Sequence, residues 1–264
     1  MAQHFQDLAY AQMGQRTLLL DLNTPDTPQR RWPIVVWIEG GGWANGGKRR
    51  PSVFSAVKDG LLAGGCAIAS LTYRPNSEVV FPAQIAECKA AVRWLRAQAR
   101  HYHLDPDRIG AWGFSSGGYL AALLGATGTD DDVLVEGSNH LDCPSGVRAV
   151  CTYAAPAELR KQQEAMTNEL LAFHAPLPEG LLTSITADCP PFLIIHGEQD
   201  RFVPSHQAYL LHNALQKANA EATLYLVPGG KHGLGGLLPA KQDKIVAMIK
   251  AFFDRYLSGE KQYV

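Results

Sequence analysis

Ser115 lies at the centre of the stretch Gly-Phe-Ser-Ser-Gly, between an apolar, strand-like run and a helix-like run. A tight turn from a strand into a helix needs small residues two positions before and after its tip, because side chains there would collide with both elements. Gly113 and Gly117 meet this requirement, whereas a turn centred on Ser116 would place Phe114 where glycine is needed. The pattern is typical of a turn that presents a nucleophile, and Ser115 is the candidate.

A serine hydroxyl attacks poorly at neutral pH unless a base takes its proton and an acid orients that base. Two later loops contain residues of these types. Asp200 follows a predicted strand that ends at His196, and His232 lies in a glycine-rich loop after the next predicted strand. The order Ser, Asp, His, each after its own strand, predicts a triad for acyl transfer. Glu198 is the alternative to Asp200 as the acid.

Consecutive glycines follow the apolar run 34–38 and end that predicted strand. Glycine lets backbone N–H groups turn toward a negatively charged oxygen without obstruction by side chains. The residue after the nucleophile supplies a further N–H in such sites. We therefore assign Gly41, Gly42 and Ser116 to a predicted oxyanion hole.

The chain alternates strand-like runs with helical patterns, which predicts a doubly wound, mostly parallel α/β sheet with its catalytic loops at the carboxyl ends of the strands. The predicted strands are Thr17–Leu22, Ile34–Ile38, Cys66–Tyr73, Arg108–Trp112, Val147–Tyr153, Phe192–His196 and Thr223–Val227. The predicted helices are Tyr119–Ala126, Ala83–Arg100, Gln207–Ala218 and Lys241–Leu257. A length of 264 residues favours one domain over residues 1–264.

This ordered set of motifs resembles the lipase/esterase branch of the α/β-hydrolases, within it the small feruloyl- and acetyl-esterase-like carboxylesterases. Besides the loops of Ser115, Asp200 and His232, the resemblance rests on the segments 39–43, 73–75, 81–84 and 104–109. It spans nearly the whole chain. It implies the α/β-hydrolase fold and a serine carboxylesterase that hydrolyses short-chain or compact acyl esters through an acyl-enzyme.

Glu39 departs from the pattern of that family, which has histidine before the oxyanion glycines. The family histidine holds the loop through hydrogen bonds, and one hypothesis is that Glu39 does the same with another partner. The alternative is that a carboxylate near the oxyanion alters the electrostatics of the site and has a raised pKa if it is desolvated.

The substrate pocket has two sets of candidate residues. The segment 157–187 lies outside the strand and helix alternation and is predicted to be a lid or a wall of the acyl pocket, with a plain packing helix as the alternative. Aromatic residues beside the catalytic motifs are candidate substrate-binding residues, although such residues also build cores. They are Trp43, Phe114 and Tyr119.

Composition narrows the kinds of partner, cofactor and cellular location that we expect for the protein. A formal net charge of −1 argues against nucleic acid or an anionic membrane as the main partner, so a small-molecule ester is the expected one. The five scattered cysteines and the other histidines show no metal-ligand spacing, and we expect neither metal nor cofactor. No apolar run approaches the roughly 20 residues of a membrane span. A cytoplasmic location is expected unless a signal peptide was removed. The oligomeric state stays open.

Two other functions remain as alternatives to ester hydrolysis. The same triad can cleave amides, as in peptidases or formamidases of this superfamily. A non-catalytic binding protein built on a hydrolase fold is the other class, but such proteins usually have an incomplete triad. The triad of this chain is complete at the level of sequence.

Overall fold

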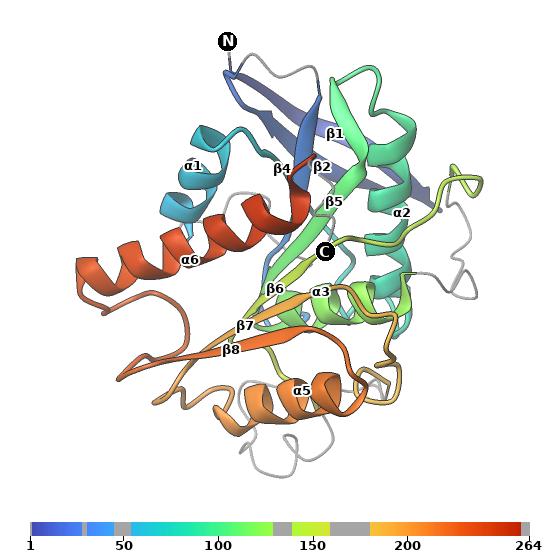
Figure 1. The fold of residues 1–264 in the computed structure, drawn as a ribbon. Helices are drawn as coiled ribbons and strands as arrows, with labels where there is room; N and C mark the ends of the chain where they lie inside the picture. Colours follow the sequence, from blue (N-terminus) through green and yellow to red (C-terminus); the bar gives the residue numbers. More distant parts are fainter. Residues whose placement is uncertain (1, 28–30, 45–53, 129–138, 159–179, 260–264) are drawn as a thin grey trace.

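This computed structural model describes residues 2–27, 31–44, 54–128, 139–158 and 180–259, and they are built on one mixed sheet. Its eight strands run in the order β1-β2-β4-β3-β5-β6-β7-β8 (Figure 1). Both partners of β2 are antiparallel to it, and all other neighbours are parallel. The strands are β1 Gln3–Met13, β2 Arg16–Thr24, β3 Trp32–Ile38, β4 Ala67–Leu71, β5 Leu104–Phe114, β6 Val150–Tyr153, β7 Phe192–Gly197 and β8 Ala222–Val227.

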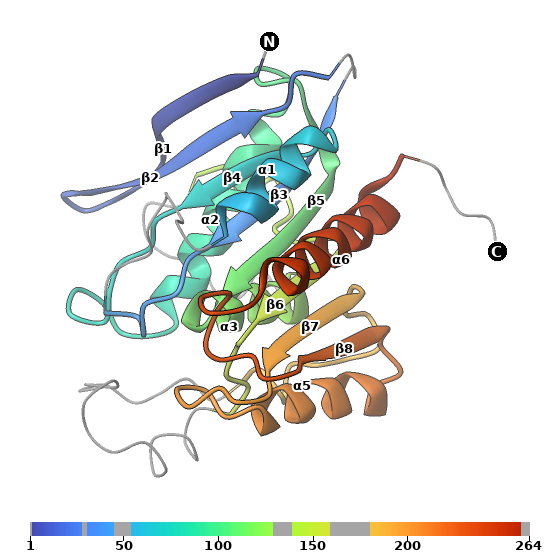
Figure 2. The same ribbon diagram turned by 90° about the vertical axis from the view of Figure 1, so that its left-hand side faces the viewer.

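Helices cover both faces of the sheet, so its central strands are buried on both sides. In β3, Ile34, Val36 and Ile38 belong to one hydrophobic cluster, and Val35 and Trp37 belong to the other. Strands of this kind read as continuous apolar runs. The first cluster contains residues of α2 (Ala83–Ala97), α3 (Ser116–Thr127) and α5 (His206–Lys217). The second contains residues of α1 (Ser55–Ala63) and α6 (Pro239–Leu257), and Figure 2 shows these two helices on the same side of the sheet.

The predicted doubly wound, mostly parallel sheet is confirmed, with two elements that the sequence reading missed. β1 was not predicted because two irregularities in its pairing with β2, between Phe5 and Leu8 and between Ala9 and Ala11, break the alternation of apolar and polar residues. α1 is short, and only Val57 and Leu61 of it are buried. β5 begins at Leu104, before the predicted Arg108, and its pairing with β3 is irregular at that end.

Backbone packing around Ser115 makes the turn between β5 and α3 unusually tight. A Cβ atom on Gly113 would lie 2.2 Å from the carbonyl oxygen of Gly117. One on Gly117 would lie 2.1 Å from the carbonyl oxygen of Ile38. Ser115 itself has φ 54° and ψ −123°, a conformation that non-glycine residues rarely adopt. The two glycines are therefore required by contact with backbone atoms that cannot move aside.

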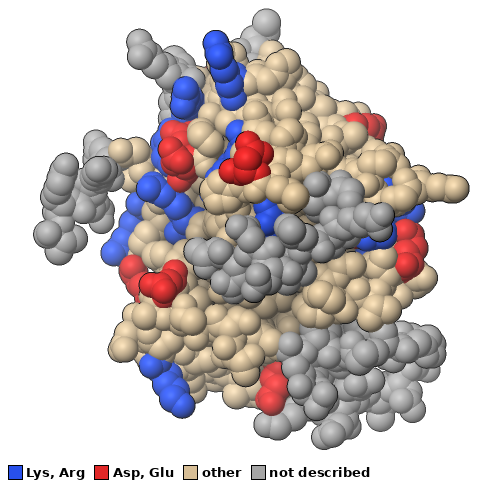
Figure 3. All heavy atoms as spheres, turned by 90° about the vertical axis from the view of Figure 1, so that its right-hand side faces the viewer, with Lys and Arg blue, Asp and Glu red and all other residues tan. Residues whose placement is uncertain are grey.

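Charged side chains are mixed in sign on the face of the molecule that Figure 3 shows. Lys and Arg lie among Asp and Glu there, and the described residues of that face form no extended surface of one sign. No helix in the described ranges has the length and apolar character that crossing a bilayer requires.

We predict that Gly113→Ala destabilises the fold strongly. Its Cβ would overlap the backbone of α3, and overpacking of this kind lowers the free energy of unfolding by about 1 to 3 kcal/mol or more. Gly235→Ala is the matched control, because nothing lies within 4 Å of a Cβ at Gly235, and its effect should stay within about 0.5 kcal/mol. Urea unfolding followed by circular dichroism measures both. Equal midpoints for the two variants would contradict the packing argument.

Candidate active site

Ser115, Asp200 and His232 come together at the carboxyl ends of the parallel strands. Ser115 follows β5, Asp200 lies in the loop after β7, and His232 lies in the loop after β8. The imidazole Nε2 of His232 is 3.1 Å from Ser115 Oγ, and its Nδ1 is 2.7 Å from Asp200 Oδ2. With the proton on Nδ1, His232 donates to Asp200 and accepts from the Ser115 hydroxyl. This is the hydrogen-bonded chain that a triad needs.

The Asp200 carboxylate is buried and fully engaged. Its Oδ1 accepts hydrogen bonds from the backbone N–H groups of Phe202 and Val203, each at 2.9 Å. Burial raises its pKa, but the contacts with His196, His232 and the Val203 backbone N–H together outweigh burial, so the pKa lies well below the ordinary value. Because folding lowers this pKa, the ionised carboxylate stabilises the fold above the ordinary aspartate pKa. That contribution is lost as pH falls toward the lowered value.

His196 is completely buried beneath the acid loop. Its Nε2–H donates to the carbonyl oxygen of Val203 at 2.8 Å and lies 3.5 Å from Asp200 Oδ2. This placement agrees with a structural rather than a proton-transferring role. His196 fixes the turn that aims Asp200 at His232.

Glu198, the alternative acid, has a different contact. Its Oε2 accepts a hydrogen bond at 3.3 Å from the backbone N–H of Gly229, in the loop that carries His232. The backbone N–H of Gln199 donates to the carbonyl oxygen of Gly230 at 2.8 Å in the same region. Glu198 thus joins the two loops, and it is Asp200 that reaches the imidazole.

The loop after β3 lies directly against the serine turn. A Cβ on Gly40 would be 2.9 Å from Ser115 Cβ and 2.7 Å from the carbonyl oxygen of Phe114. Gly41 and Gly42 have φ of 132° and 60°, and a hydrogen bond from Ala44 N–H to the Gly41 carbonyl closes the turn at 3.0 Å. Ser116 is the first residue of α3, so its N–H belongs to the free amino end of a helix, which favours negative charge. Assignment of these donors to an oxyanion hole remains a prediction.

Hydrogen bonds from outside hold the oxyanion loop. The Tyr73 hydroxyl donates to the carbonyl oxygen of Glu39 at 3.1 Å, and the Asn76 N–H donates to the carbonyl oxygen of Trp43 at 2.9 Å. The Glu39 carboxylate accepts from the N–H of Gly40 at 3.3 Å. Glu39 therefore contacts its own loop, in line with the hypothesis of a loop-holding role.

The segment that carries Tyr73 and Asn76 is itself tied to α2. Glu87, buried in α2, accepts from the Arg74 backbone N–H at 2.7 Å and from the Arg74 guanidinium. Burial raises the pKa of Glu87, and the Arg74 hydrogen bonds oppose that rise. Gln84 of α2 donates to the Asn76 side chain at 2.9 Å. The segments 73–75 and 81–84 of the sequence motif thus brace the oxyanion loop.

The three candidate aromatic residues have different environments. Trp43 and Tyr119 are 3% and 1% exposed and pack edge to face, with ring centroids 5.8 Å apart. The Phe114 ring lies 4.8 Å from the His232 imidazole. Sequence reasoning missed Phe202, whose ring lies 5.4 Å from the imidazole and which is 46% exposed. Its position two residues after Asp200 was the available signal. Substrate binding by Trp43, Phe114 and Tyr119 stays a prediction.

Most of the predicted lid segment 157–187 lies outside the described residues, which lack 159–179. Its two ends are described. Ala157 and Leu181 are buried in the core cluster that includes α3, and Ile185 packs against the same cluster. Both described ends of the segment are therefore packed into the core on the side of the sheet that carries α2, α3 and α5.

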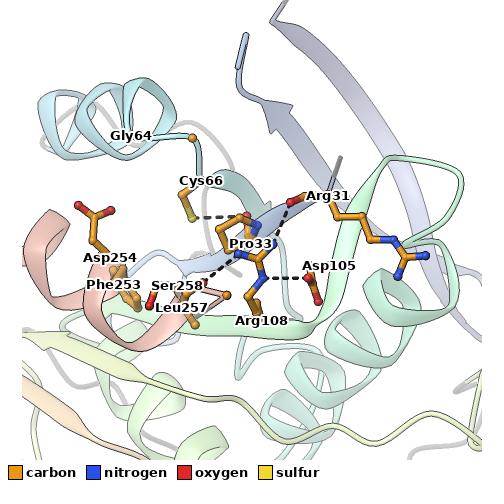
Figure 4. Close-up of a pocket in the computed structure, with 12 residues that line it drawn as sticks. Arg31, Pro33, Gly64, Cys66, Asp105, Arg108, Phe253, Asp254, Leu257 and Ser258 are labelled. Carbon is orange, nitrogen blue, oxygen red and sulfur yellow. Dashed lines mark hydrogen bonds and ion pairs between the residues drawn. The ribbon is translucent and has the colours of Figure 1, made fainter. Parts of the chain in front are cut away.

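Two cavities differ in what their charged groups can do. One, of about 560 Å³, is lined by Asp200 and His232 together with Gln199, Arg201, Phe202 and Lys231. The other, of about 850 Å³, lies at the opposite edge of the sheet, beside the end of α6 (Figure 4). There Arg108 donates to Asp105, to the Leu257 carbonyl and to the Arg31 carbonyl, so its guanidinium is already engaged in structural hydrogen bonds.

The described residues contain no group of three or more His, Cys, Asp or Glu side chains that could hold a metal ion.

Comparison with known proteins identifies the family. Residues 20–215 match the model of the BD-FAE family, and the chain belongs to that family. Residues 179–260 also match the prolyl oligopeptidase family. The architecture is the α/β-hydrolase fold, as the resemblance implied.

Several similar proteins are named as esterases. Esterase LipQ of Mycobacterium tuberculosis is 29% identical over 97% of this chain and 63% of its own length. This chain thus spans less than two thirds of that relative. A truncated carbohydrate esterase from gut microbiota superposes with a TM-score of 0.79 at 27% identity, covering 95% of this chain and 96% of that one. A bifunctional GH43-CE protein of Bacteroides eggerthii gives 0.84 at 29% identity, covering 97% and 38%.

We predict that Asp200→Asn removes most of the hydrolytic activity and that Glu198→Gln leaves it nearly unchanged. An amide in place of the carboxylate favours the wrong imidazole tautomer, and kcat should fall on the order of ten-thousandfold. The contact of Glu198 within the described residues is with the backbone of a neighbouring loop, so kcat of Glu198→Gln should stay within about twofold. Steady-state hydrolysis of p-nitrophenyl acetate measures both. The acid assignment fails if the Glu198 variant is the one that loses activity.

Proposed function

We propose that the protein is a serine carboxylesterase that hydrolyses short-chain or compact acyl esters. The hydrogen-bonded chain Ser115–His232–Asp200 carries the proposal, because it joins a nucleophile, a base and a buried, ionised acid. Membership of the BD-FAE family and the esterase names of similar proteins support it.

The proposed reaction begins when Ser115 Oγ attacks the ester carbonyl carbon while His232 Nε2 takes the hydroxyl proton. Asp200 stabilises the imidazolium that forms. The tetrahedral intermediate then collapses, the bond from carbonyl carbon to alkoxy oxygen breaks, and His232 gives its proton to the departing alcohol. A water molecule repeats the sequence on the acyl-enzyme, which releases the carboxylic acid and restores Ser115.

The oxyanion of each tetrahedral intermediate is assigned to the N–H groups of Gly41, Gly42 and Ser116. Losing one such donor typically costs about a hundred- to a thousandfold in kcat. The loop that carries the two glycines is held before substrate arrives, because Tyr73 and Asn76 donate hydrogen bonds to the carbonyl oxygens of Glu39 and Trp43. The glycines adopt the positive φ angles that this loop requires. Preorganised donors of this kind stabilise developing charge without reorganisation during the reaction.

Amide hydrolysis has no comparable support. The match to the prolyl oligopeptidase family is confined to residues 179–260, which hold Asp200 and His232 but not Ser115. The match to the BD-FAE family includes Ser115 and the oxyanion glycines. We therefore keep ester hydrolysis as the single proposed activity.

Ser115→Ala tests the proposal directly. Loss of a triad serine costs about a millionfold in kcat, so hydrolysis of p-nitrophenyl acetate should disappear while the circular dichroism spectrum is unchanged. A fluorophosphonate probe should label wild-type protein at Ser115 and at no other serine, as read by peptide mass spectrometry. Retention of more than a few per cent of the activity by the variant would reject Ser115 as the nucleophile.

Acyl chain length tests the second half of the proposal. We expect kcat/KM to peak at acetyl to butyryl p-nitrophenyl esters and to fall beyond about eight carbons, because each methylene changes discrimination by only about 1 to 3 kcal/mol. The rate should not jump when the substrate forms an emulsion. Efficient hydrolysis of long-chain triglyceride would overturn the limit on acyl size.

A further inference from the structure

The cavity beside His232 carries two positive charges that the triad does not use. Arg201 follows Asp200 and Lys231 precedes His232, and both side chains are exposed and line the cavity. Within the described ranges, neither side chain has a hydrogen bond, an ion pair or an aromatic ring as partner. Some exposed cations of the described residues do have such partners; Arg16, for example, pairs with Glu78.

Two carboxylates lie near these cations, and neither forms an ion pair with them. Among the described residues Asp200 is the one acidic residue in the lining, and its two carboxylate oxygens accept from Phe202, Val203 and His232. Glu198 does not line the cavity, and its Oε2 accepts from Gly229. Within the described residues, Arg201 and Lys231 are therefore unpaired cations in the lining of the cavity, where a negatively charged group can approach them.

Backbone contacts join the two loops from which the cationic side chains extend. A Cβ on Gly197 would lie 2.4 Å from the carbonyl oxygen of Lys231, so the end of β7 and the His232 loop touch directly. The Gln199 hydrogen bond to Gly230 joins the same two loops. The charges are thus carried by backbone that the catalytic geometry already fixes.

The chemistry of His232 decides which part of a substrate meets these charges. His232 gives its proton to the leaving alcohol, so the alcohol, and not the acyl group, lies beside the imidazole. The exposed Phe202 ring, 5.4 Å from the imidazole, offers an apolar surface on which a ring of that alcohol can lie.

We propose that the enzyme prefers esters whose leaving alcohol contains a ring that bears a carboxylate, with Arg201 and Lys231 as the residues that recognise the carboxylate. The inference rests on the proposed ester hydrolysis and adds the chemical class of the alcohol. Arg201 can bind a carboxylate through two N–H groups, and Lys231 acts as a point charge.

Two acetate esters of equal size test the preference. They are 4-acetoxybenzoate, which is anionic, and 4-acetoxybenzamide, which is neutral, and the quantity compared is the ratio of their kcat/KM values. Arg201→Gln and Lys231→Gln should each lower this ratio about two- to fivefold, the range of an exposed charge pair. The double variant should lower it further. Intrinsic reactivity cancels, because every variant is given the same two esters.

The controls separate recognition at the site from general attraction. Lys231→Arg keeps the charge and should largely keep the ratio. Lys217→Gln removes an exposed charge at the far end of α5 and should leave the ratio unchanged. In about 1 M salt, where the screening length is about 3 Å, the wild-type ratio should shrink.

A double variant with the wild-type ratio, or a Lys217 variant with an equal fall, would overturn the preference while leaving the proposed esterase intact. If the wild type hydrolyses the neutral ester but not the anionic one, the preference is likewise wrong. If it hydrolyses neither ester, the proposed function fails and the preference fails with it.

Discussion

The backbone contact between the serine turn and the end of β3 is the constraint on which the rest of the site depends. Gly117 lies so close to the Ile38 carbonyl that no side chain fits between them, and a Cβ on Gly40 would also come within 2.9 Å of Ser115 Cβ. The turn that exposes the nucleophile and the loop that carries the oxyanion glycines are therefore one packed unit. Ser115 has a positive φ, which a non-glycine residue keeps only where its surroundings hold it in that conformation. Here backbone atoms on two sides of the turn do so.

The remaining loops support this unit from two directions. After β4, Tyr73 and Asn76 hold the predicted oxyanion loop, and the half-buried Arg74 holds their segment against the buried Glu87 of α2. After β7 and β8, the loops of Asp200 and His232 are joined to each other by hydrogen bonds that do not involve these two side chains. A carboxylate buried with both oxygens occupied stays ionised, so the imidazole has one stable orientation.

Sequence reasoning succeeds here where chemistry constrains local sequence strongly. A serine turn needs its two glycines, and buried parallel strands need continuous apolar runs, so both were predictable. β1 was not, because bulges remove the alternation by which an edge strand is recognised. The bracing contacts of Tyr73 and Glu87, and the ring of Phe202 beside His232, join residues far apart in the chain. Only the folded structure brings these partners together, so the contacts themselves could not be predicted from local patterns, although the position of Phe202 two residues after Asp200 was a signal.

The two faces of the His232 imidazole differ in a way that has consequences for substrate choice. Its Nδ1 is fully engaged by Asp200, a buried acid whose two oxygens both have donors. Toward solvent the imidazole borders a cavity with an exposed aromatic ring and two cations. The side toward Asp200 sets the tautomer and so the chemistry, which depends little on the identity of the alcohol. In the proposed mechanism, the leaving alcohol takes its proton from His232 on the open side. Residues there, such as Arg201 and Lys231, are placed to affect the choice of leaving group without contacting the hydrogen bond between Asp200 and His232.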